Sequence, residues 1–171
     1  MRALLAVAAR AAGLSVLAVQ PVAAQGDPGW SYFSVDAEHS ARVSDGGDEL
    51  VIRCKGTARE IVLYLDTTTL DPALRGQPSA VLAVVVDGAG SILWLRGRLI
   101  ADGRRTSIGF ANSNADQFAH SIALATRSVG ASLLLGDQPR PDTPRYNSVQ
   151  FPAAGAAAAI KAAYDGCGIP F

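Results

Sequence analysis

Short runs with alternating apolar and polar residues dominate the chain, and this period of two is typical of half-buried β-strands. The run 61–66 is the clearest, because it is rich in residues that favour strands. The run 80–86 is almost wholly apolar, which indicates a central strand covered on both faces. We expect strands at 30–35, 49–54, 61–66, 80–86, 92–100, 106–110, 131–135 and 148–151, with a weaker run before Asp45.

Glycine-containing turns separate several of these runs. Asp45-Gly46-Gly47, Asp87-Gly88-Ala89-Gly90 and Asp102-Gly103 each lie between two expected strands. Aspartate followed by glycine supplies the positive φ angles that tight hairpin turns require. The spacing of these turns therefore predicts an antiparallel meander.

Two segments have the periodicity of helices instead. In 114–126 the apolar residues fall on one face, with Ser113 or Asn114 as the cap and Gly130 beyond the end. The alanine-rich segment 156–164 is the second helix, and Gly166 ends it. Segments 67–77 and 136–146 are expected to be loops, the first of them exposed. The predicted fold class is α+β, a predominantly antiparallel sheet or sandwich with two packed helices and one disulfide.

The first 24 residues have the pattern of an export signal. Arg2 and Arg10 provide positive charge, a short apolar run follows, and Val22-Ala23-Ala24 suits a signal peptidase. We expect residues 1–24 to be removed and residues 25–171 to form one mature domain, which would be periplasmic or secreted. An uncleaved anchor or a buried helix is the alternative.

The charge balance bears on possible partners. The whole chain has 15 basic and 15 acidic residues, and both arginines of residues 1–24 are lost on cleavage while no acid is lost. A mature domain this close to neutral has no electrostatic attraction to bulk nucleic acid or to an anionic membrane. We therefore expect neither as a partner, and no stable membrane insertion after cleavage.

Cys54 and Cys167 are the only cysteines. In an exported chain they are expected to form a structural disulfide that fixes the last helix to the sheet. On the chain-entropy model, a closed loop of roughly 100 residues stabilises the fold by roughly 4–5 kcal/mol. Two free buried thiols are the alternative.

The sequence offers little for catalysis. His39 and His120 are the only histidines, and each precedes a serine (Ser40, Ser121), but adjacent residues point in different directions on a strand or a helix. We expect His120 to be a helix-surface residue. Motifs for a hydrolase nucleophile, a metalloprotease, a P-loop or a dinucleotide site are absent from the sequence. The acids at turns are interpreted as turn residues, so we expect no enzyme activity, no cofactor and no metal.

One surface stands out as a candidate for binding. Trp94, Arg96 and Arg98 alternate along one expected strand and would therefore share a face. Arg104 and Arg105 follow the next turn, and either, with Arg105 as our candidate, would extend the patch. Such a patch suits carboxylates or phosphates. Ordinary solvated arginines on the outer face of a sheet are the alternative.

The layout of residues 30–167 resembles two groups of small bacterial envelope proteins. These are the VasI proteins, which accompany type VI secretion systems, and, more distantly, the invasion-associated locus B proteins. The resemblance rests on Trp30-Ser31-Tyr32-Phe33, on Leu50-Val51-Ile52-Arg53-Cys54, on Val86-Asp87 with Trp94 soon after, and on the segment from Phe151 to Cys167.

The resemblance implies a periplasmic accessory protein that has no enzyme activity. We expect such a protein to contact another envelope protein through the surface of Trp94, Arg96 and Arg98, with a cell-wall or lipid anion as the other ligand that this surface suits. An inhibitor of an extracellular hydrolase, such as a lysozyme or a protease, is the alternative, with loop 67–77 entering the active-site cleft.

Overall fold

The computed structural model describes residues 29–55, 60–88, 92–102, 105–111, 113–136, 140 and 142–171. For residues 55, 60, 92, 101–102, 105–111 and 113–114 it describes the backbone only. The expected export signal, residues 1–24, lies outside the described residues.

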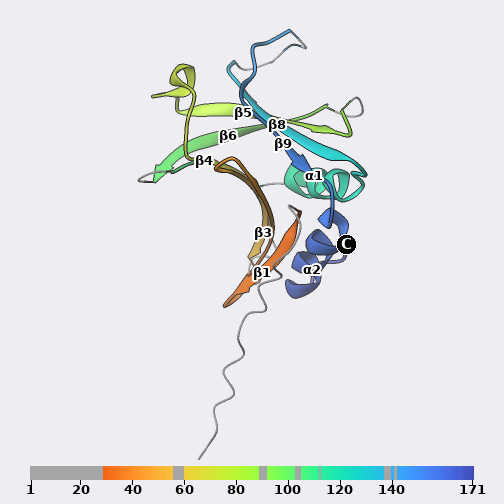
Figure 1. The fold of residues 1–171 in the computed structure, drawn as a ribbon. Helices are drawn as coiled ribbons and strands as arrows, with labels where there is room; N and C mark the ends of the chain where they lie inside the picture. Colours follow the sequence, from red (N-terminus) through yellow and green to blue (C-terminus); the bar gives the residue numbers. More distant parts are fainter. Residues whose placement is uncertain are drawn as a thin grey trace, which may run out of the picture.

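The described part of the chain forms nine antiparallel strands in one continuous ladder (Figure 1). Their order across the sheet is β1-β2-β3-β4-β7-β6-β5-β8-β9, so β1 and β9 are the edge strands and the sheet is open. The strands are β1 (Ser31–Val35), β2 (Glu38–Asp45), β3 (Asp48–Lys55), β4 (Glu60–Thr67), β5 (Ser79–Val86), β6 (Ile92–Asp102), β7 (Arg105–Ala111), β8 (Ser128–Leu134) and β9 (Tyr146–Pro152).

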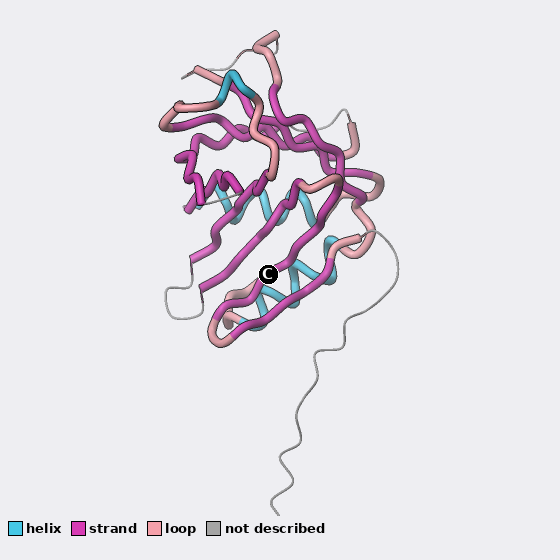
Figure 2. Tube along the Cα trace, turned by 60° about the vertical axis from the view of Figure 1, so that its left-hand side comes forward, coloured by secondary structure: helices cyan, strands magenta, loops and turns pink. Residues whose placement is uncertain are grey.

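Two helices, α1 (Ser113–Ala123) and α2 (Ala156–Gly166), pack on one side of this sheet. The sheet bends around them, so that β1–β4 and β5–β9 form two halves at an angle to each other (Figures 1 and 2). Helix α2 packs against β1, β2, β3 and α1, and α1 packs against β4, β5, β6 and β7. The predicted α+β fold, an antiparallel sheet with two packed helices, is therefore confirmed.

The main core lies between the sheet and the helices. Every second residue of the central strands points into it, as Leu50 and Ile52 of β3 and Leu63 and Leu65 of β4 illustrate. Tyr164 of α2 and Phe151 of β9 are its largest fully buried side chains. On β5, Ala80 to Val84 are all buried, which confirms the prediction of a central strand covered on both faces.

Glycines occupy positions where the backbone adopts a positive φ angle. The β2–β3 hairpin is closed by Gly46 and Gly47 alone, and both have positive φ. At the other end of the fold, Gly155 has φ +78° and its α-carbon faces the backbone of Trp30, where an added Cβ would lie 2.9 Å from the carbonyl oxygen. Only glycine allows both the backbone angle and this close approach.

Trp30 joins the two edges of the sheet. Its backbone N–H donates to the Ala154 carbonyl oxygen at 2.9 Å, and its indole N–H donates to the Pro152 carbonyl oxygen at 3.0 Å. Trp30 precedes β1 and Pro152 ends β9, so these bonds hold the start of one edge strand against the end of the other. The bent sheet is fixed at this point.

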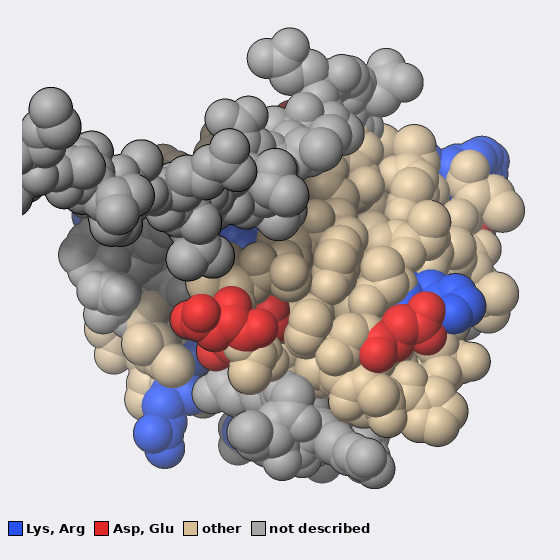
Figure 3. All heavy atoms as spheres, turned by 90° about the horizontal axis from the view of Figure 1, so that it is seen from below, with Lys and Arg blue, Asp and Glu red and all other residues tan. Residues whose placement is uncertain are grey.

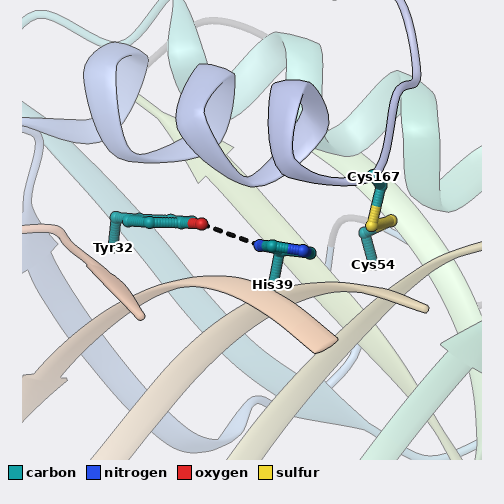
Figure 4. Close-up of a disulfide and its surroundings, with 4 residues drawn as sticks. All are labelled: Tyr32, His39, Cys54 and Cys167. Atoms are coloured by element: carbon teal, nitrogen blue, oxygen red, sulfur yellow. Dashed lines mark hydrogen bonds between the residues drawn. A yellow bond between two sulfur atoms is a disulfide. The ribbon is translucent and has the colours of Figure 1, made fainter. Parts of the chain in front are cut away.

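The Cys54–Cys167 disulfide fixes α2 to the sheet, as predicted (Figure 4). Cys54 lies next to the last residue of β3, and Cys167 follows α2 directly. The two α-carbons are 6.3 Å apart, although 113 positions separate the residues in the sequence.

Loop 67–77 is largely exposed, as expected, but two of its residues are buried. Thr67 is 1% exposed and Leu74 is fully buried in the main core. Leu74 lies in the short 3-10 turn η1 (Pro72–Leu74), which is capped by the Asp71 carboxylate. The sequence did not predict the burial of Leu74, because the apolar residues of this loop are too few to show a strand or helix periodicity. No helix within the described residues is long and apolar enough to span a membrane.

Candidate binding surface

Strand β6 positions three of the predicted site residues. Trp94, Arg96 and Arg98 occupy alternate positions of β6, while Leu95 and Gly97 between them are buried. Trp94 is half-buried and packs on Val81 and Ala83 of β5 and Leu134 of β8, a small apolar cluster separate from the main core. Arg96 and Arg98 are exposed. The three side chains thus lie on the face of the sheet opposite the helices.

The register of the ladder extends this surface across β5 and β8. Trp94 pairs with Ala83, which pairs with Ser132, and Arg96 pairs with Val81, which pairs with Leu134. The Arg96 guanidinium donates to the Gly136 carbonyl oxygen at 3.3 Å. Val81, Ala83 and Leu134 therefore form an apolar floor beside Trp94 and Arg96. Ser132 lies at the far side of this floor.

The fourth predicted site residue, Arg105, lies on β7, the strand next to β6. It is the first residue of β7, and its backbone pairs with Asp102 at the end of β6. Its side chain lies outside the described part, as does the whole of Arg104.

A shallow groove of about 350 Å³ adjoins the apolar floor. Its lining comes from β5, β8 and β9 and includes Ser132, Ser148, Gln150 and the residue before β9, Arg145. The β8–β9 register shifts between Ala131 and Leu133, and this bulge interrupts the ladder beside the groove. The Arg145 guanidinium reaches across to the Ser132 hydroxyl at 3.4 Å. The sequence did not predict this groove, because a bulge has no simple sequence pattern.

The charges that the structure describes on this surface have one sign. Arg96, Arg98 and Arg145 are exposed, and none of the described side chains of β5, β6, β8 and β9 is acidic. We call Trp94, Arg96, Arg98, Arg145 and their apolar floor the β6 surface. Its chemistry suits a ligand that is both anionic and partly apolar.

The two histidines lie elsewhere, next to the helices. His39 accepts or donates a 2.7 Å hydrogen bond with the Tyr32 hydroxyl through Nδ1, and the two rings lie nearly parallel beneath α2 (Figure 4). Ser40, its neighbour, is buried and accepts a hydrogen bond from Arg42 instead. His120 is an exposed helix residue, as expected, and the Ser121 hydroxyl donates to the Gln117 carbonyl.

An aromatic cluster joins α1, α2 and the C-terminus. The buried Tyr164 hydroxyl donates to the Asp116 carboxylate at 2.7 Å, and the rings of His120 and Phe171 pack on Tyr164. Burial, and then the bond to the anionic Asp116, raises the pKa of Tyr164 far above its usual value. A tyrosine that resists ionisation is a poor base or nucleophile, so this cluster is best explained by packing between the helices.

Asp87 has the opposite electrostatic environment. Its carboxylate accepts hydrogen bonds from the backbone N–H groups of Thr126, Arg127 and Ser128 and from the Thr126 hydroxyl. These bonds, that from the Thr126 backbone first, hold the pKa of Asp87 well below its usual value. The sequence predicted a turn residue here, and Asp87 does have a positive φ. It also ties the β5–β6 turn to the segment after α1.

Groups of three or more potential metal ligands are absent from the described residues. Comparisons with protein-family models, with curated proteins and with solved structures found no match to this chain.

Proposed function

We propose that this protein is an exported, non-enzymatic accessory protein of the bacterial envelope, which binds another envelope protein through the β6 surface. The observation that carries the proposal is the chemistry of this surface. A tryptophan and three arginines surround an apolar floor, and no acid lies among the described side chains of its strands. Tryptophan and arginine are the residues most enriched at the energetic centres of protein interfaces.

The partner should present acidic residues around an apolar centre. Carboxylates would pair with the arginine guanidinium groups, and an apolar side chain would cover Trp94 and the floor formed by Val81, Ala83 and Leu134. The Cys54–Cys167 disulfide supports an exported location, because disulfides persist in oxidising compartments. The resemblance of residues 30–167 to envelope accessory proteins supports the same location.

The test begins with the oxidised protein as bait for proteins of the native cell envelope, identified by mass spectrometry. We expect Trp94→Ala with Arg96→Ala to weaken capture of the partner by about tenfold or more, the range of a binding hot spot. Arg75→Ala is the matched control, because it removes an exposed arginine outside the β6 surface. Equal capture by the double variant and the control, with both folded, would exclude this surface.

One observation favours the alternative, an inhibitor of an extracellular hydrolase. Loop 67–77 is held firmly although much of it is exposed, since Leu74 is buried in the core. The Asn147 side chain also bonds both the Thr69 carbonyl and the Asp71 N–H. A loop held in one conformation loses little entropy on entering a cleft. Inhibition of a lysozyme or a protease that is lost in Pro72→Gly would favour this function.

A further inference from the structure

Strand β1 is an open edge with unusually apolar side chains. All five of its residues are exposed, and Tyr32, Phe33 and Val35 are exposed by 41%, 48% and 66%. None of the five is charged, whereas natural edge strands are commonly protected by charge, proline or a covering segment. Seen from below Figure 1, where β1 and α2 lie, most of the described surface is uncharged (Figure 3).

The open edge presents backbone groups in a symmetric arrangement. Asp36 and Ala37 form the two-residue turn between β1 and β2, and Val35 pairs with Glu38 across it. The pair that flanks such a turn is hydrogen-bonded, and hydrogen-bonded pairs alternate along an antiparallel ladder. Tyr32 and Ser34 therefore direct their backbone N–H and C=O groups away from β2. Phe33 lies midway between them.

We propose that β1 pairs antiparallel with β1 of a second copy of this chain, about a two-fold axis at Phe33. Tyr32 of each copy then faces Ser34 of the other, and each of these two pairs exchanges two backbone hydrogen bonds. The two Phe33 residues form a non-hydrogen-bonded pair, in which side chains approach most closely. The sheet continues from one copy into the other, and the exposed apolar side chains are covered.

The charges at the ends of β1 favour this occupant and this direction. Asp36 follows one end of β1, and Arg42 of β2 lies opposite Ser31 at the other end. Antiparallel pairing places the α-carbon of Asp36 of each copy about two strand spacings, or about 10 Å, from the α-carbon of Arg42 of the other copy. The Arg42 guanidinium lies 5.2 Å from the centre of the Phe33 ring, so the Arg42 side chain reaches from β2 to β1, the strand at the proposed axis. A parallel arrangement would place the two Asp36 residues side by side.

This interface is independent of the proposed function. Four strands separate β1 from β6 in the sheet, so pairing through β1 leaves the β6 surface of each copy open. A dimer built in this way presents two β6 surfaces.

Light scattering on the purified, oxidised protein over a range of concentrations provides the first test. We expect a dimer whose dissociation constant rises by about tenfold or more in Ser34→Pro, because proline removes an outward N–H while leaving the β1–β2 bonds in place. Ser34→Ala is the matched control and should dimerise normally. A monomeric mass at every concentration, with a folded protein, would overturn the proposal.

Cross-linking tests the register. The native cysteines are joined to each other, so an introduced cysteine is the only free thiol. Phe33→Cys should form a disulfide-linked dimer on mild oxidation, because the two thiols meet at the axis. Val35→Cys should not, because Val35 faces Ser31 of the other copy. Equal cross-linking of both variants would contradict this register. A protein that stays monomeric and binds a different envelope protein through β1 would contradict the proposed dimer.

Discussion

At the scale of single residues, Asp87 shows how a turn residue can also hold distant parts of the chain together. Its carboxylate bonds the backbone of residues 126 to 128, about 40 positions further along. The local sequence predicted the turn, because aspartate before glycine favours positive φ. It could not predict the second role, since the partners are backbone groups and leave no trace in residue type.

The lowered pKa of Asp87 makes a prediction about acid. A carboxyl group with a lowered pKa in the folded state stabilises the fold above its unfolded pKa, about 3.9, and loses this effect as the pH falls from there toward the folded value. Asp87→Asn should therefore lower the Tm at pH 7, and the difference from the unmodified protein should shrink at pH 3. Thermal unfolding followed by circular dichroism at both pH values measures this.

Asp142→Asn is the control for Asp87, because Asp142 is an exposed loop residue and its carboxylate has no hydrogen bond within the described part. It should leave the Tm unchanged at both pH values. A difference between Asp87→Asn and the unmodified protein that stays constant from pH 7 to pH 3 would show that the charge of Asp87 is not involved.

At the scale of elements, the sequence predicted most strands and both helices, and it failed where long-range contacts decide a boundary. The first helix was expected to reach residue 126 but ends at Ala123. The Asp87 carboxylate binds the backbone N–H groups that would otherwise continue it, beginning at Thr126. Strand β2 was only a weak run, because Ala41 and Val43 are the only buried apolar residues that it gives to the core.

The disulfide between β3 and α2 should contribute a large share of the stability. For a separation of 113 residues the chain-entropy model gives roughly 4–5 kcal/mol. Reduction, or Cys54→Ala with Cys167→Ala, should therefore lower the free energy of unfolding in urea by about 2–5 kcal/mol. The two treatments should agree, since each removes the same cross-link.

Helix α2 should remain folded after the cross-link is removed, though less stably. Tyr164 still bonds Asp116 of α1, and Ile160 and Ala163 remain buried in the core. The helical circular dichroism signal of the double variant in the absence of urea measures this. A fall of the total helical signal by the share that α2 contributes would show that the disulfide, rather than packing, holds the helix on the sheet.

At the scale of the whole molecule, the sequence left a single sheet and a sandwich both open, and the reason is physical. Strands β1–β4 follow one another both in the sequence and in the sheet, but β4 is next to β7, and β5 is next to β8. Alternation of apolar residues fixes the faces of a strand and not its neighbours. The β6 surface shows the same limit: periodicity placed Trp94, Arg96 and Arg98 on one face, whereas Arg145 comes from another part of the chain.

The two halves of the sheet should unfold together, because one core and the Trp30 bonds join them. The chain has two tryptophans, so Trp94→Phe leaves Trp30 as the only indole reporter at the junction between β1 and β9. In this variant, the urea transition followed by Trp30 fluorescence should coincide with the transition followed by circular dichroism, as for a two-state domain. An earlier fluorescence midpoint would mean that the edges separate before the halves unfold.

Trp30→Phe should lower the free energy of unfolding by about 1 kcal/mol, since it removes the bond to the Pro152 carbonyl but keeps most of the buried ring.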